Sequence, residues 1–163
     1  MPRLKGSCHC RAVQFSLVSH TPQPYQFCYC SICRKTAGGG GYAINIMGEA
    51  DTLEVEGEEH LSVYHAKGTE DHGKEPSPAG RRFCKHCGSA LFILDSRYPK
   101  WAYPFASAID TPLPVPPERV HVMLHYKAEW VEVLDTPEDM LFGGYPDQSI
   151  EQWHRKNGLY KPE

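Results

Sequence analysis

Seven cysteines, gathered in three short clusters, constrain this chain of 163 residues more than any other feature of its sequence. An odd number of cysteines cannot all pair in internal disulfides, and the basic N-terminal residues are not followed by the apolar stretch of a secretory signal. We therefore expect a cytoplasmic protein, in which thiols stay reduced and metal binding is favoured over a disulfide framework. The cysteines are Cys8, Cys10, Cys28, Cys30, Cys33, Cys84 and Cys87.

The spacing within the clusters is typical of zinc ligands. Zinc takes about four ligands at tetrahedral corners, with Zn–S distances of about 2.3 Å. Two residues separate Cys84 from Cys87, and Gly88 follows, so a tight turn can direct both sulfurs at one ion. In an extended strand, Cys8 and Cys10 would point to the same side. These two pairs together would complete one four-cysteine site.

The remaining thiols, those of Cys28, Cys30 and Cys33, form a set of three. A closed four-ligand zinc site is structural, whereas a site with three protein ligands keeps a position for water or substrate. This division uses every cysteine and predicts two zinc ions per chain. Two alternatives stay open, namely a single zinc with leftover thiols, and buried cysteines that bind no metal.

The segments that carry these cysteines resemble the glutathione-dependent formaldehyde-activating enzyme family, which includes the centromere protein V-like proteins. In chain order they are Gly6–Phe15, Cys28–Lys35 and Arg82–Leu91. The resemblance spans residues 5–134, which we assign to the zinc domain, and leaves residues 135–163 as a C-terminal extension. It implies a mainly β fold of the Mss4-like type, in which zinc stabilises antiparallel sheets.

The resemblance also implies an activity, that of a carbon–sulfur lyase acting on a thiol adduct such as S-(hydroxymethyl)glutathione. The partner would be a small-molecule thiol or its adduct, with glutathione as the founding example. The implied structural zinc is held by Cys8, Cys10, Cys84 and Cys87. The implied second, catalytic zinc is held by Cys28, Cys30 and Cys33.

Two positions differ from the residues that the family commonly has. Arg11 stands where the family has Gly, from which we expect a backbone that is not left-handed at this position. Tyr29 stands where the family has His, which removes an imidazole between two proposed ligands. Neither change touches a cysteine.

Zinc bound by three thiolates is a mild Lewis acid, well suited to binding a further thiolate and lowering its pKa. Arg34 and Lys35 directly follow Cys33. If the three-cysteine segment opens a helical turn, these two cations lie near the metal and could pair with substrate carboxylates. The alternative is that they are solvated surface charges. The sequence singles out no general acid or base.

Short segments of alternating apolar and polar residues predict strands separated by turns, and so an antiparallel β architecture. The continuous apolar segment 90–94 predicts a strand buried on both faces. Near the C-terminus, Ser149 and Gln152 form a capping box for a short helix, which we expect to dock weakly through Trp153. The alternating segments are 12–18, 52–56, 61–65, 120–124 and 130–133, and a further strand is expected at 42–46.

Charge and hydropathy exclude some classes of partner. Lys and Arg number 17 against 20 Asp and Glu, so the net charge of −3 argues against nucleic acid or an anionic membrane as a partner. The apolar runs are far shorter than the ~20 residues of a spanning helix. A non-catalytic, zinc-stabilised protein-interaction module and a thiol redox sensor remain the alternatives to an enzyme. The oligomeric state is not indicated.

Overall fold

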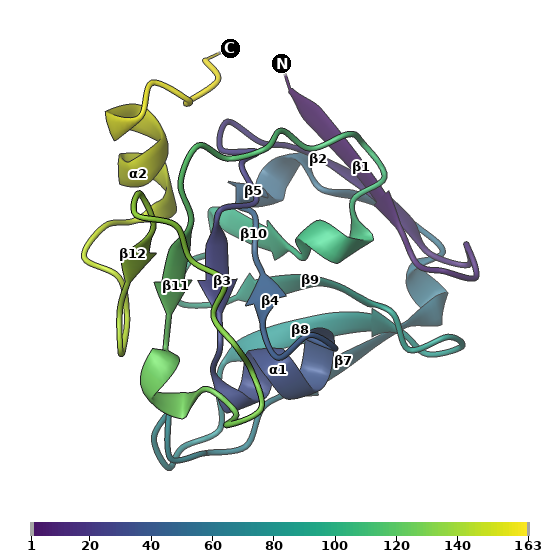
Figure 1. Cartoon of the computed structure of the whole chain (residues 1–163). Coiled ribbons are helices and arrows are strands. Elements are labelled where there is room, and N and C mark those ends of the chain that lie inside the picture. Colours follow the sequence, from purple (N-terminus) through teal and green to yellow (C-terminus); the bar gives the residue numbers. More distant parts are fainter. Residues whose placement is uncertain (1, 163) are drawn as a thin grey trace.

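Short strands in three sheets dominate the fold over residues 2–162, which the computed structural model describes (Figure 1). The predicted mainly β class with a short C-terminal helix is confirmed. The helices are α1 (Ser31–Ala37) and α2 (Ile150–Lys156). The strands are β1 (Arg3–Ser7), β2 (Gln14–Val18), β3 (Gln26–Cys28), β4 (Ala43–Ile44), β5 (Gly48–Glu49), β6 (Glu54–Glu56), β7 (Leu61–His65), β8 (Ala79–Cys84), β9 (Ala90–Asp95), β10 (Trp101–Pro104), β11 (Val120–Val122) and β12 (Met140–Leu141).

The sheets follow the orders β1-β2-β6, β5-β10-β9-β8-β7 and β12-β11-β3-β4. All pairs in the first two sheets are antiparallel, as expected. In the third sheet, β11 runs parallel to both β3 and β12. This parallel pairing sets Val122 beside Cys28, so a segment almost one hundred residues further along the chain lies next to the three-cysteine cluster.

One predicted strand, at residues 130–133, is absent from the structure. In this segment Trp130 is 71% exposed, and only Val131 is buried. The side chain of Val131 occupies the space beside Gly41, where an added Cβ would lie 2.2 Å from its Cγ2. The buried strand predicted at 90–94 is confirmed as β9, whose residues Leu91 and Phe92 are almost fully covered.

Two apolar clusters form the core, and each contains cysteines. One joins β2, β9 and β10 and includes the ring contact of Phe15 with Phe92, whose centroids lie 5.2 Å apart. Cys8 and Cys84 belong to this cluster. The other joins β3, β11, α1 and α2, and it includes Cys30. Because each buried Leu or Phe contributes about 2 kcal/mol to folding, both cysteine groups rest on well-stabilised supports.

The C-terminal helix docks more firmly than the sequence predicted. Ser149 and Gln152 make the predicted capping box at the start of α2. Trp153 is 1% exposed and stacks on Tyr25 with 3.7 Å between the ring centroids. Its indole Nε1–H donates to Glu118 Oε1 at 2.7 Å. A fully buried tryptophan with its polar atom satisfied makes α2 part of the second core cluster.

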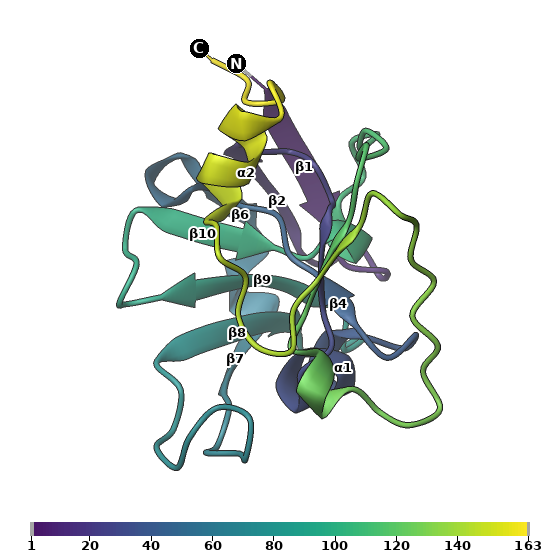
Figure 2. The ribbon, with the colours of Figure 1, turned by 60° about the vertical axis from the view of Figure 1, so that its left-hand side comes forward.

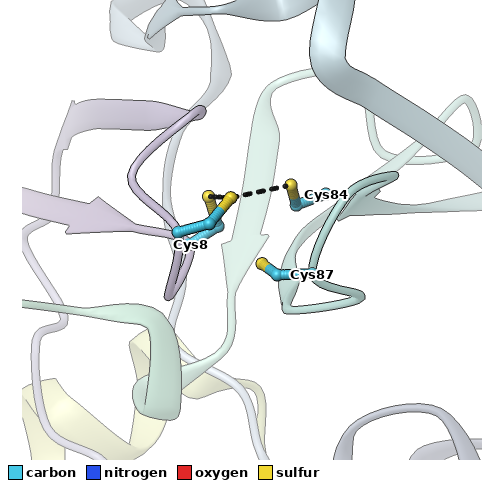
Figure 3. A group of neighbouring side chains, drawn as sticks. Cys8, Cys84 and Cys87 are labelled. Carbon is cyan, nitrogen blue, oxygen red and sulfur yellow. Dashed lines mark hydrogen bonds between the residues drawn. The ribbon is translucent and has the colours of Figure 1, made fainter.

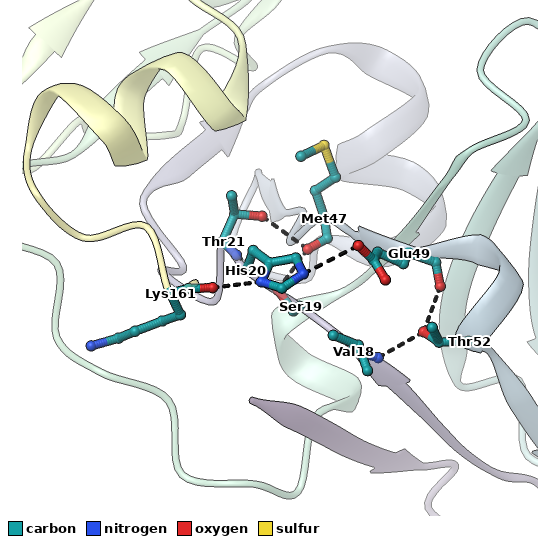
Figure 4. A network of polar contacts seen from close by, with 8 residues as sticks. All are labelled: Val18, Ser19, His20, Thr21, Met47, Glu49, Thr52 and Lys161. Atoms are coloured by element: carbon teal, nitrogen blue, oxygen red, sulfur yellow. Dashed lines mark hydrogen bonds and ion pairs between the residues drawn. The ribbon is translucent and has the colours of Figure 1, made fainter. Parts of the chain in front are cut away.

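The chain after α2 returns to the loop that follows β2 (Figure 4). The backbone N–H of Lys161 donates to the carbonyl of His20 at 2.9 Å, and the His20 ring also contacts the carbonyl of Lys161. The other nitrogen of this ring, Nε2, lies 3.1 Å from Glu49 Oε1. Figure 2 shows the C-terminal segment beside the start of β1. Within residues 2–162, neither α-helix has the length and apolarity needed to cross a membrane.

Candidate metal centres

Four cysteines on two turns converge on one point (Figure 3). One turn follows β1 and the other follows β8. The Sγ atoms of Cys8 and Cys10 lie 3.6 Å apart, and those of Cys10 and Cys84 lie 3.7 Å apart. Tetrahedral zinc with Zn–S bonds of about 2.3 Å holds its sulfurs about 3.8 Å apart. With Cys87, whose sulfur lies within 4.8 Å of the other three, the set fits a four-thiolate site.

The backbone of the first turn corrects one expectation. Arg11 has φ of 67°, so it is left-handed, although a non-glycine residue was expected to avoid this region. The reason is the turn itself, in which the Arg11 N–H must fold back to the Cys8 carbonyl at 3.0 Å. The side chain lies near Ser7 and Asp110, which partly offset a strain of about 1 kcal/mol. The second turn uses Gly88, with φ of 76°.

Hydrogen-bond donors lie beside two of these sulfurs and favour the thiolate at Cys87. At Cys10, a backbone hydrogen bond is outweighed by desolvation and the neighbouring thiols, which raise the pKa to about 12. The Val13 N–H donates to Cys8 Sγ at 3.3 Å. The Ser89 hydroxyl lies 3.2 Å from Cys87 Sγ. Together with backbone N–H groups of Cys10 and Ser89, it lowers the pKa of Cys87 to about 5. A thiol that is ionised at neutral pH is prepared to bind a metal.

The other three cysteines form the second group, at the start of α1. Their sulfurs lie within 4.8 Å of one another. Cys30 caps the helix, since its Sγ accepts the Cys33 N–H at 3.3 Å. Cys30 and Cys33 are buried, whereas Cys28 at the end of β3 is partly exposed. The fold therefore brings the cysteines together in one group of four and one group of three, as the sequence predicted.

A cation from β8, which the sequence analysis did not single out, lies against the second group. Arg81 Nη2 lies 3.8 Å from Cys33 Sγ, and its Nη1 donates to Thr36 Oγ1 at 3.2 Å. Hydrogen bonds from the Cys28 and Cys30 thiols, aided by the charge of Arg81, hold the pKa of Cys33 well below its ordinary value. The same thiol contacts raise the pKa of Cys28. Of these two thiols, Cys33 therefore loses its proton more readily than Cys28.

The two cations named from sequence lie elsewhere on α1. Lys35 is exposed, and Arg34 is partly buried with its Nε unpaired. Within residues 2–162, no hydrogen bond joins either side chain to a cysteine sulfur. Arg81 is therefore a further cation beside the second group, in addition to Arg34 and Lys35, and it contacts a cysteine sulfur directly.

Two neighbouring cavities lie on the surface near Arg81 and Cys8. One of about 350 Å³ is lined by Arg81, Thr36, Tyr64 and Phe105. Another, of about 550 Å³, extends past Cys8. The two share Thr36, Gly88 and Ala90, so they form neighbouring parts of one hollow. A concave surface that combines apolar walls with a cation suits a small molecule bearing a carboxylate.

Tyr29, between two of the second group's cysteines, begins a buried polar chain. Its hydroxyl lies 2.8 Å from His121 Nδ1, and His121 Nε2 lies 3.3 Å from Asp139 Oδ2. All three side chains are at most about 2% exposed. Although burial opposes it, hydrogen bonds from the backbone of Arg119 and Thr136 keep the pKa of Asp139 lowered. Burial raises the pKa of Tyr29 to about 12, so the hydroxyl stays protonated and can donate to His121.

The chain is similar to several known proteins. A family model described as glutathione-dependent formaldehyde-activating enzyme matches residues 3–125, which include all seven cysteines. A curated protein of Halomonas elongata, named "Putative glutathione-dependent formaldehyde-activating enzyme", is 58% identical over 156 residues, covering 96% of this chain and 97% of that protein. A crystal structure of a Rhodobacter sphaeroides protein aligns with a TM-score of 0.50 and 25% identity, over 68% of this chain and 91% of that one.

Proposed function

Because this chain belongs to the glutathione-dependent formaldehyde-activating enzyme family, we propose that it is a zinc-dependent carbon–sulfur lyase. Its substrate would be a thiol adduct such as S-(hydroxymethyl)glutathione. The observation that carries the proposal is the second cysteine group, which has three thiols and no fourth cysteine, and whose Cys33 contacts Arg81, a residue that also lines a cavity of about 350 Å³. Three protein ligands are typical of zinc sites that bind a substrate.

Two zinc ions per chain follow from the two donor sets. The four-cysteine group would hold a structural zinc, because its sulfur–sulfur distances of 3.6 and 3.7 Å match those of a tetrahedral thiolate site. The group of Cys28, Cys30 and Cys33 would hold the second zinc. When bound there, zinc supplies a coordination position that favours a thiolate over a thiol.

The chain's own residues would position the substrate. The guanidinium of Arg81 helps to lower the pKa of Cys33, after the larger effect of the Cys28 and Cys30 thiols, and it brings a positive charge to the lining of the cavity. In the direction of adduct formation, the substrate's thiolate sulfur attacks the carbonyl carbon of formaldehyde, and the C–S bond forms. The electron pair of the C=O π bond moves to oxygen, which then takes up a proton. Arg34 and Lys35 stay proposed contacts for the carboxylates of the substrate.

Metal counting and turnover test the proposal together. The wild-type protein should bind two zinc ions. It should also catalyse the formation and cleavage of the adduct between formaldehyde and a thiol such as glutathione. Cys30→Ser should bind one zinc ion and lose turnover, with little change in the melting temperature. A wild-type protein that binds one zinc ion, with the same count in Cys30→Ser, would refute the second metal site.

One observation favours the non-catalytic interaction module as a second candidate. A ring nitrogen of His72 and a carboxylate oxygen of Asp71 lie within 4.8 Å of Cys30 Sγ and of each other. A permanent fourth protein ligand would close the second site to substrate and leave it structural. The two functions therefore differ in whether an added thiol reaches the metal.

A further inference from the structure

The loop between β7 and β8 carries a tight turn to the second cysteine group. Its base is closed by the Ser77 N–H, which donates to the Ala66 carbonyl at 2.8 Å. At its tip, Thr69 and Gly73 form a β-bridge, and the His72 N–H donates to the Thr69 carbonyl at 3.2 Å. Gly73 completes the turn with φ of 79°, a conformation that glycine adopts without strain. The backbone therefore holds the tip in a defined shape.

Asp71 fastens this tip to the first residue of α1. Its Oδ2 accepts the Ser31 N–H at 2.6 Å, and its Oδ1 accepts the Ser31 hydroxyl at 2.7 Å. The Thr69 hydroxyl also donates to Oδ1, at 2.6 Å. Both carboxylate oxygens therefore accept hydrogen bonds, and Asp71 holds the turn against α1. The neighbouring residue, His72, is the one left free to act as a metal ligand.

The imidazole ring of His72 lies close to the second cysteine group and has a buried nitrogen without a hydrogen-bond partner among residues 2–162. A ring nitrogen of His72 lies within 4.8 Å of Cys30 Sγ. Its Nε2 is buried, and within residues 2–162 it has no hydrogen-bond partner. Burying a polar nitrogen without a partner is unfavourable, and imidazole nitrogen is a common zinc ligand. We propose that His72 is the fourth protein ligand of the second zinc in the resting protein, and that a substrate thiolate displaces it.

The geometry favours a ligand that can leave. The His72 nitrogen lies close to Cys30, but it does not join all three cysteine sulfurs in one group within 4.8 Å. Ligation therefore requires a small movement of the side chain on the anchored turn. When a thiol enters, its proton passes to solvent, its sulfur takes the position on the metal, and the imidazole withdraws. This inference rests on the proposed second zinc site.

Cadmium NMR on the full chain tests the proposal directly. We would load protein containing ¹⁵N-labelled histidine with ¹¹³Cd, which replaces zinc in thiolate sites. Two cadmium resonances are expected, of which one is split by coupling to a histidine ¹⁵N. The splitting should vanish in His72→Ala and persist in His65→Ala, because His65 is an exposed histidine on the adjacent strand β7. If the alanine variant fails to fold, His72→Gln keeps a polar side chain of comparable size.

Adding glutathione separates the outcomes. In the wild-type protein, saturating glutathione should remove the splitting and shift the same resonance towards that of the four-thiolate site. Chelator competition should show that His72→Ala binds its second zinc about tenfold more weakly, and the variant should bind glutathione more tightly. Two resonances without splitting, unchanged in His72→Ala, would overturn the His72 assignment alone. A splitting that survives glutathione would overturn displacement, and a single resonance would overturn the second metal site itself.

Discussion

Replacing Tyr29 by Phe removes one hydroxyl from the buried chain that supports the three-cysteine group. The hydroxyl lies 2.8 Å from His121 Nδ1, and both side chains are 1% exposed. The variant loses this hydrogen bond and leaves the His121 nitrogen unpaired away from water. An intramolecular hydrogen bond contributes about 1 kcal/mol, and an unsatisfied buried partner costs about 1–3 kcal/mol. We expect the free energy of unfolding to fall by about 2 kcal/mol.

The assay is thermal and denaturant unfolding of zinc-loaded protein at neutral pH. For a chain of this length, 1 kcal/mol shifts the melting temperature by about 3 °C, so Tyr29→Phe should melt about 6 °C lower. Tyr98→Phe is the matched control, because Tyr98 is 53% exposed and its change should stay within about 0.5 kcal/mol.

The polar chain should also affect the metal, because Tyr29 lies between Cys28 and Cys30. Chelator competition on Tyr29→Phe should show about tenfold weaker binding at the second site and unchanged binding at the first. If Tyr29→Phe unfolds like the wild type and holds both metals equally well, the hydrogen bond to His121 has no supporting role.

Three further predictions concern other parts of the chain. Cys84→Ser should fail to fold, since structural zinc supplies folding energy outright, and a soluble variant with a native circular dichroism spectrum would contradict this. Arg11→Gly should raise the free energy of unfolding by about 0.5 kcal/mol in denaturant titrations, because glycine relieves the left-handed strain. A lower free energy of unfolding would show instead that the lost contact of Arg11 with Asp110 matters more than the strain. Burial lowers the pKa of His154, whose Nε2 accepts the Gln23 N–H, so folding favours the neutral ring. The neutral His154 ring contributes its full stabilisation above the unfolded pKa of about 6.5, and this contribution declines as the pH falls below that value. Urea titrations at pH 8 and 5.5 should therefore show a smaller loss of unfolding free energy in His154→Gln than in the wild type.

One predicted strand was wrong, and one contact beside the second cysteine group could not be predicted from sequence. The alternating segment 130–133 imitates a strand, although Val131 is a single anchor beside Gly41. Arg81 is 48 residues from Cys33, and its contact depends on how β8 is placed beside α1. A pattern of apolar residues records which side chains are buried, but it does not record which distant segment covers them.

The amino-acid sequence alone determined the division of the cysteines into four and three and the capped C-terminal helix. These features depend on spacings of a few residues, where turn and helix geometry leave few choices. Tertiary structure decided the surroundings of the second group. His121 reaches Tyr29 only because β11 pairs in parallel with β3, and His72 reaches Cys30 only because the β7–β8 loop folds back onto α1. Contacts between distant segments depend on strand order and register, which short-range spacing does not specify.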